Sequence, residues 1–262
     1  MNNKEQKSFP RGYFGDATTK VPSAETIISS AAPFRRAFLE FVKSLPHGAR
    51  VLDAGCGKGK FAITVLSLRP DIELYGMDIT DVSSMLPRGI KFKIGSVERL
   101  DEMYEKDFFD AIICGHVIEH LLYPLSFMEG IKEILKPNGL FYLETPNWSR
   151  ALVPVLDSFF WNDYTHIRIF TKQTLLRLFA DYNFDVIRLF SVSSSSFFMP
   201  TGNLSQIKRF YHKKISNKAS MGLLAKITQF PRLFFSFFSK VIARIVSIFL
   251  RDVLVAVVLN KK

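Results

Sequence analysis

A glycine-rich stretch near residue 55 has the residue types and spacing of a binding loop for a polar small molecule. Residues 51–61 read VLDAGCGKGKF, which predicts a buried strand, a tight turn and a helix that starts near Lys58. Glycine lets backbone pass close to a ligand, and the first turn of a helix offers N–H groups that have no intrahelical partner. The dinucleotide-binding pattern requires glycine at position 60, where this chain has Lys60. We therefore expect an anionic or polar ligand that is recognised through a different pattern.

A second acidic residue, Asp78, ends a strand-like run at 72–78 and follows Asp53 by 25 positions. The carboxyl ends of parallel strands meet at one edge of a sheet, so the loop after Asp53 and the side chain of Asp78 are expected at one site. A structural turn, with Asp78 as a solvated loop acid, is the alternative.

Three titratable residues follow the apolar run 109–115: His116, Glu119 and His120. His116 comes directly after the predicted strand, and we interpret it as a substrate contact or general base, with a packing or capping histidine as the alternative. Glu119 and His120 have the chemistry of a metal-binding pair, but no third ligand follows at helical spacing. The sequence therefore predicts no metal site and favours a role for this pair in fixing the following helix, with a metal-binding pair as the alternative.

The stretch WNDYTHIRIFT at 161–171 precedes another predicted helix. Tyr164 and His166 in this stretch are expected on a loop at the same predicted edge of the sheet, where their side chains can orient a substrate hydroxyl. A loop fixed by its own hydrogen bonds is the alternative.

Several motifs together resemble the class I S-adenosylmethionine (SAM)-dependent methyltransferases. The acidic-x-Gly-x-Gly-x-Gly pattern at 53–59 resembles the first motif of that family. The Glu-His pair at 119–120 resembles the fourth motif, in the form found in ubiquinone-type O-methyltransferases of methyltransferase type 11/23. Leu-Lys-Pro-Asn-Gly at 135–139 and His-x-Arg-x-Phe-Thr at 166–171 resemble further elements of that subgroup.

The resemblance implies SAM as the cofactor and methyl transfer as the reaction. In that family the first motif cradles the amino-acid part of SAM, and the carboxylate that ends the second strand, here Asp78, binds the ribose hydroxyls. Many relatives carry aspartate for the adenine amino group where this chain has Ser96; a hydroxyl is a weaker partner, and the backbone at Val97 is the alternative contact. The implied catalytic residues are His116 and His166. The implied cofactor contacts are Asp53, Ala54, Gly55, Gly57, Gly59, Asp78, Ile79, Ser96, Val97 and Cys114.

Alternating strand and helix patterns predict an α/β fold with helices on both faces of a mainly parallel sheet. The strands are expected at 49–53, 72–77, 90–94, 109–114, 139–144, 184–190 and 252–259, and the helices at 58–68, 81–86, 122–135 and 172–182. The resemblance, which covers about 45–190 and 252–260, implies a Rossmann-like doubly wound sheet of seven strands in the order 3-2-1-4-5-7-6. Its last strand is antiparallel, and a helical insert separates strands 6 and 7.

The predicted domain organisation has three parts. Residues 1–45 are expected to form an irregular arm, up to about residue 22, and one or two lead-in helices that are interrupted near Pro33. Residues 46–190 and 252–262 form the SAM-dependent methyltransferase domain, and residues 191–251 form a basic amphipathic helical insert.

The positive charge of the chain is concentrated in that insert. The formal net charge is +11; ten of the 35 Lys and Arg residues lie in 191–251, which has no Asp or Glu, and the rest of the chain has 25 basic and 24 acidic residues. Within 232–251 the polar side chains form one narrow stripe on an otherwise apolar helix, which predicts a helix in the membrane interface. Lys240 and Arg244 would sit near the middle of a bilayer, so a spanning helix is disfavoured. A helix docked on the protein or on a second subunit is the alternative, and nucleic-acid binding is disfavoured because apolar residues dominate.

Two cysteines give neither a disulfide framework nor a metal-ligand spacing, and residues 1–16 lack the apolar core of a secretory signal, so a cytoplasmic location at the cytoplasmic face of the membrane is expected. The predicted function is O-methylation of an amphiphilic or lipid-linked acceptor, such as a quinone-like compound or a surface-glycan precursor, with peripheral membrane contact through 205–250. The alternatives are a soluble small-molecule or RNA methyltransferase and a SAM-binding subunit without turnover. The acceptor, the methylated atom and the oligomeric state are left open.

Overall fold

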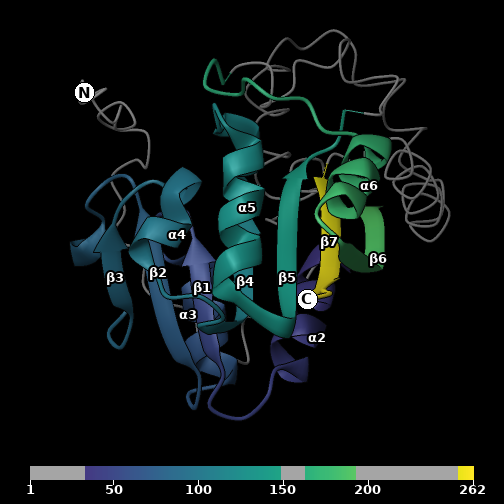
Figure 1. The fold of residues 1–262 in the computed structure, drawn as a ribbon. Helices are drawn as coiled ribbons and strands as arrows, with labels where there is room; N and C mark the ends of the chain where they lie inside the picture. The colour runs from purple at the N-terminus through teal and green to yellow at the C-terminus, as the bar shows by residue number, and fades with distance from the viewer. Residues whose placement is uncertain (1–32, 149–162, 193–252) are drawn as a thin grey trace, which may run out of the picture. The chain divides into compact units, whose positions relative to one another are not determined.

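The computed structural model describes residues 33–148, 163–192 and 253–262. In these ranges the chain forms one seven-stranded sheet with helices on both faces (Figure 1). The strands are β1 Arg50–Ala54, β2 Glu73–Asp78, β3 Lys91–Ile94, β4 Phe109–Gly115, β5 Leu135–Pro146, β6 Phe184–Val192 and β7 Val253–Asn260. The helices are α2 Pro33–Ser44, α3 Lys60–Leu68, α4 Leu100–Met103, α5 Pro124–Ile134 and α6 Lys172–Asp181, with short 3-10 turns η1 Ser83–Met85, η2 Val97–Arg99 and η3 Ile118–His120.

The strand order is β3-β2-β1-β4-β5-β7-β6. Strands β1 to β5 pair in parallel, whereas β7 is antiparallel to both of its neighbours, β5 and β6. The sequence of β7, VLVAVVLN, is apolar at almost every position because both faces of this inner strand are covered. The predicted fold class and strand order are confirmed.

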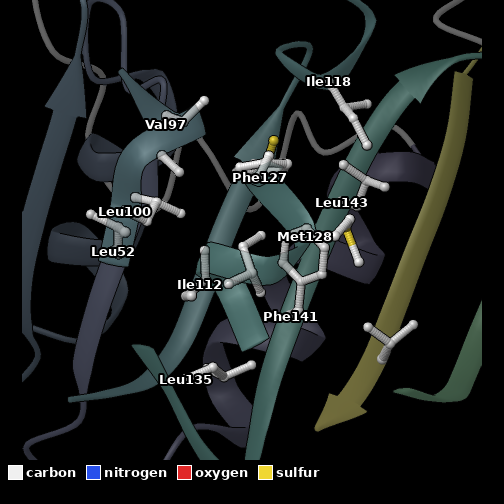
Figure 2. Packing of buried hydrophobic residues seen from close by; sticks show 14 of the residues in the cluster. Leu52, Val97, Leu100, Ile112, Ile118, Phe127, Met128, Leu135, Phe141 and Leu143 are labelled. Carbon is white, nitrogen blue, oxygen red and sulfur yellow. The ribbon is translucent and has the colours of Figure 1, made fainter. Parts of the chain in front are cut away.

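An apolar core lies between each face of the sheet and the helices that cover it. Helices α4, α5 and α6 cover one face, and α2 and α3 cover the other (Figure 1). Figure 2 shows Phe127 and Met128 of α5 packed toward Ile112, Phe141 and Leu143 of the sheet. All five side chains are fully buried, and each burial contributes about 1.5–3 kcal/mol. This packing holds β4 and β5, which carry several candidate site residues at their ends.

Some predicted boundaries are wrong, for local reasons. The helix expected from residue 58 begins at Lys60, because Gly59 takes a left-handed φ of 73°. The helix expected at 81–86 is only the 3-10 turn η1. Strand β5 begins at Leu135 rather than at residue 139: Asn138 has a φ of 60°, and a shift in register against β4 accommodates the expected turn inside the strand. The predicted break near Pro33 coincides with the first residue of α2.

The predicted arm, up to about residue 22, lies within the undescribed residues 1–32, and most of the predicted insert 191–251 lies within the undescribed residues 193–252. The predicted domains and the 205–250 helix therefore stay predictions. In the part of the chain that the structure describes, no helix has the length and apolar character needed to cross a membrane.

The candidate site lies at one edge of the parallel part of the sheet. Strands β1, β2, β3, β4 and β5 run in one direction, so their carboxyl ends lie along one edge. The glycine-rich loop, Asp78, Ser96 and His116 all follow or end these strands. In open α/β sheets this edge is where ligands bind.

Candidate active site

The glycine-rich loop between β1 and α3 folds back onto the end of β2. Gly55 and Cys56 donate their backbone N–H groups to Met77 O, at 2.8 and 3.0 Å. Gly57 donates its N–H to Asp78 Oδ2, at 3.0 Å. Gly55 has a φ of 76°, which glycine adopts without the steric penalty of a side chain. The protein itself therefore holds the loop against the carboxylate of Asp78.

Asp78 presents its carboxylate at the predicted position, at the end of β2. The side chain is buried, and its Oδ1 accepts the N–H of Thr80 at 3.0 Å. Burial raises the pKa of Asp78, while hydrogen bonds from Thr80, Gly57 and Ile79 oppose the shift. A fixed carboxylate beside the loop can accept hydrogen bonds from the two hydroxyls of a ribose.

Asp53, at the end of β1, is buried beneath the loop. Neither carboxylate oxygen has a hydrogen-bond partner of good geometry, although the side chain is only 1% exposed. Burial raises the pKa of Asp53 to about 7, and the nearby charge of Asp78 adds to the rise. A buried carboxylate in this state favours the approach of a cationic group.

The other predicted cofactor contacts lie at the same edge. Ala54 ends β1, Gly59 precedes α3 and Ile79 follows β2. The hydroxyl of Ser96 accepts the N–H of Glu98 at 3.2 Å and so caps η2. The side chains of Val97 and Cys114 are buried in the apolar core, so a cofactor contact at either residue would come from the backbone.

His116 lies directly after β4 in a left-handed conformation, with a φ of 57°. Its backbone N–H donates to Glu144 O at 2.9 Å, and its side chain is half exposed. Its Nδ1 lies 3.4 Å from Glu119 Oε1 and its Nε2 lies 3.8 Å from Glu144 Oε2. Burial lowers the pKa of His116, but the two carboxylates outweigh it, and the net shift is upward. A positive charge on this ring is therefore stabilised.

Glu119 is fully buried in η3 and anchors the loop that carries His166. Its Oε2 accepts the hydroxyl of Thr145 at 3.0 Å, and its Oε1 has no hydrogen-bond partner of good geometry. Its backbone carbonyl accepts the N–H groups of Ile167 and Arg168, both at 3.0 Å. The sequence predicts that Glu119 fixes the following helix; in the structure these contacts fix the 163–168 loop.

His120 and His166 lie against each other, with ring centroids 4.6 Å apart. His120 Nδ1 lies 3.2 Å from Thr165 O and 2.9 Å from Thr165 Oγ1. Burial lowers the pKa of His120, which favours a neutral ring. The ligand atoms of Glu119, His120 and His166 all lie within 4.8 Å of one another.

Sequence reasoning places His116 and His166 at one site but misses two features of it. Glu144 stands inside an apolar strand, where nothing in the local pattern marks it as a partner of His116. His166 is separated from His120 by a long stretch of sequence, so their contact depends on the loop anchored by Glu119. The position of Glu144 near the carboxyl end of a predicted strand, at the edge where the site is expected, is the signal that could have identified it.

Comparison with known proteins identifies the family and the fold of this chain. The family model described as a methyltransferase domain matches residues 29–189, which is more than half of the chain. This chain belongs to that family. The family resemblance predicted from the motifs is confirmed, with SAM as the cofactor, and the loop at 53–59 and Asp78 stay the predicted SAM contacts.

The curated relatives are similar over part of their length. A ubiquinone biosynthesis O-methyltransferase of Xanthomonas campestris is 31% identical over 128 residues, which are 45% of this chain and 52% of that protein. The chain thus spans about half the length of the curated relatives it matches.

Solved structures share the fold at low identity. A SAM-dependent methyltransferase from Archaeoglobus fulgidus has a TM-score of 0.57 at 17% identity, with 90% of this chain and 94% of that chain covered. A Burkholderia thailandensis N1-methyltransferase solved with S-adenosylhomocysteine has a TM-score of 0.55 at 14% identity, with 91% and 82% covered. At these identities the likeness shows that this chain has the same fold.

The buried acid Asp53 beneath the glycine-rich loop is expected to give SAM binding a pH dependence. If the ammonium group of SAM lies near Asp53, it favours the ionised form, so affinity should rise with pH through the pKa of about 7. The expected gain is about tenfold for each unit by which SAM lowers that pKa. Calorimetric titrations between about pH 5.5 and 7.5, where an α-amino group stays mostly protonated, measure it.

Asp53→Asn is the matched variant, because it removes the carboxylate of Asp53 and leaves that of Asp78, whose pKa is also raised. The variant should lose most of the rise in affinity with pH. An equal slope in both proteins would assign the effect to another group.

Proposed function

We propose that this protein transfers the methyl group of SAM to a hydroxyl of an amphiphilic or lipid-linked acceptor at a membrane surface. Quinone-like compounds and lipid-linked precursors of surface glycans have the required chemistry. The proposal rests on SAM binding by the family domain, on the imidazoles at the site and on the apolar character of the site's rim.

The observation that carries the membrane part of the proposal is an apolar rim beside the histidines. We define it as the exposed side chains of Leu122, Tyr123, Tyr164, Ile167 and Ile169. The two segments of the rim lie together, since a guanidinium N–H of Arg168 donates to Leu122 O at 2.7 Å. Exposed apolar side chains gathered in this way are typical of surfaces that meet lipid or an apolar ligand.

The basic segment 205–250 supports the same proposal, although it lies outside the described residues. Its sequence combines Lys and Arg with Phe, Leu and Ile and has no acidic residue. Cations of this kind attract anionic head groups, at about 1 kcal/mol each near the surface. The apolar rim and the basic segment would then orient the site toward the headgroup region, on the side of the membrane that faces the cytoplasm.

The reaction needs orientation and one proton acceptor. The acceptor oxygen attacks the methyl carbon, the carbon–sulfur bond breaks with its electron pair on sulfur, and S-adenosylhomocysteine leaves. We propose that His116 accepts the proton of the acceptor hydroxyl, because Glu119 and Glu144 stabilise the imidazolium that forms. His166 is the alternative base, on the loop beside η3. The protein would contribute alignment and exclusion of water.

Vesicle co-sedimentation tests the membrane part of the proposal. The full chain should pellet with anionic vesicles, remain largely soluble with zwitterionic ones, and lose binding when 205–250 is replaced by a short linker. The double variant Tyr164→Ser/Ile169→Ser should pellet less well, because it removes two rim side chains. Ile187→Ser is the control, since Ile187 is similarly exposed but lies on strand β6.

Two results would redirect the search for the acceptor. A full chain that stays soluble with anionic vesicles would contradict the membrane proposal and favour a water-soluble acceptor. Salt-sensitive RNA binding without vesicle binding would favour an RNA acceptor instead.

A further inference from the structure

A cluster of metal-binding side chains lies at the site, beyond what SAM-dependent methyl transfer requires. Glu119 and His120 come from η3, and His166 comes from the loop before α6. Their ligand atoms lie within 4.8 Å of one another. Two imidazoles and one carboxylate are ligands that divalent transition metals bind readily.

The buried carboxylate of Glu119 favours a cation at this cluster. It is fully buried; Oε2 accepts the hydroxyl of Thr145, and Oε1 has no hydrogen-bond partner of good geometry. Within the described residues its ion-pair partner is His116, whose Nδ1 is 3.4 Å from Oε1. A buried carboxylate oxygen without a hydrogen bond is unfavourable unless a cation lies against it. His116 supplies such a cation only when its ring is protonated, whereas a metal ion beside Oε1 would supply a permanent one.

The contacts of His120 show which of its nitrogens would bind the metal. The hydroxyl of Thr165 donates to Asp163 Oδ1, so it can only accept from His120 Nδ1, 2.9 Å away. Nδ1 therefore carries the proton, and Nε2 has the lone pair. Asp163 also faces His166, with its Oδ2 3.8 Å from Nε2. Carboxylate, hydroxyl and carbonyl groups that orient histidines in this way are typical of the surroundings of metal ligands.

We propose that Glu119, His120 and His166 bind one divalent transition-metal ion of the Zn²⁺, Co²⁺ or Fe²⁺ type. The nitrogen-rich set disfavours Mg²⁺ and Ca²⁺, which prefer oxygen ligands. Metal–ligand bonds of about 2.0–2.2 Å require donor atoms closer together than the widest pair here. Binding would therefore draw the 163–168 loop toward η3.

The role of the ion rests on the proposed O-methylation, whereas its binding does not. An acceptor hydroxyl bound to the ion would be polarised and held in position for attack on the methyl carbon. The carbon–sulfur bond of SAM breaks as before, and the metal keeps its oxidation state. The ion would thus act as a Lewis acid and as a positioning group for the acceptor.

Metal titration of the full chain tests the proposal without an acceptor. After treatment with a chelator and dialysis, the protein should bind one Zn²⁺ or Co²⁺ per chain by calorimetry, far more tightly than Mg²⁺. Bound Co²⁺ should give visible absorption bands that report its coordination. Glu119→Gln and His166→Asn should each weaken binding by more than about 100-fold, and Thr165→Val, which loses a partner of His120, by about 10–100-fold.

Matched controls separate the site from general histidine binding and from misfolding. His47→Ala should leave the affinity unchanged, because His47 is exposed and lies far along the chain from this cluster. SAM affinity and the unfolding midpoint should be retained in Glu119→Gln and His166→Asn. Unchanged metal affinity in those folded variants, or no binding to the full chain, would overturn the proposal. Tight metal binding without methyl transfer to any hydroxyl acceptor would instead count against the proposed function.

Discussion

Replacing Asp78 with alanine is expected to weaken SAM binding by about 100-fold. The variant loses an acceptor for the two ribose hydroxyls, and hydrogen bonds to a charged group contribute about 1.5–3 kcal/mol each. It also loses the contact from Asp78 Oδ2 to the N–H of Gly57, which holds the glycine-rich loop. Both losses act on the cofactor site, and isothermal calorimetry measures them together.

Two further substitutions make this result specific. Asp81→Ala is the matched control, because Asp81 is an exposed acid that accepts the N–H of Ser83 at 3.1 Å. Asp78→Asn keeps one acceptor oxygen and the size of the side chain, so its affinity should lie between those of the wild type and Asp78→Ala. Unchanged SAM affinity in Asp78→Ala would remove the ribose assignment.

Replacing Gly55 with alanine is expected to destabilise the protein by about 2–5 kcal/mol. A Cβ atom there would lie 2.3 Å from Val117 Cγ2, a distance at which Val117 or the loop must move. The backbone φ of 76° adds about 1–2 kcal/mol for any residue with a side chain, and overpacking adds about 1–3 kcal/mol. Urea unfolding measures the difference. Methyl transfer should also fall, because Val117 follows His116 directly.

Gly48→Ala separates the two contributions. Gly48 has a similar φ of 66°, but a Cβ atom at this position would meet no other atom of the described residues within 4 Å, so only the backbone penalty should remain. The double variant Gly55→Ala/Val117→Ala should recover part of the lost stability. Equal losses in Gly48→Ala and Gly55→Ala would show that contact with Val117 is unimportant.

The parts of this protein that could be predicted from sequence are those in which neighbouring residues act together. The loop at 53–59 and the strand ending in Asp78 each carry their own pattern, and the fold brings both to one edge. Motif resemblance implies the strand order, including the antiparallel β7, which local pattern does not determine. Strand β5 shows where local pattern fails. Its first residues have a sequence typical of a turn, yet they belong to the strand, and Asn138 takes a positive φ there.

Contacts between distant segments could not be predicted in this way. His120 and His166 meet because the carbonyl of Glu119 accepts two N–H groups of the 163–168 loop. The sequence offers no periodicity that joins these segments, so from sequence alone Glu119 and His120 form a pair without a third ligand. The partnership of His116 with Glu144 likewise depends on the pairing of β4 with β5.

The position of β7 has a consequence for how this protein can vary. Strand β7 completes the sheet between β5 and β6, yet residues 193–252 separate it from β6 in the chain. In general, lengthening the connection between two paired strands costs only about 0.6 kcal/mol for each doubling of its length. Related chains can therefore lengthen, shorten or exchange this segment at a small thermodynamic penalty to the sheet. One methyl-transfer scaffold could acquire different means of reaching its acceptors while the SAM site stays the same.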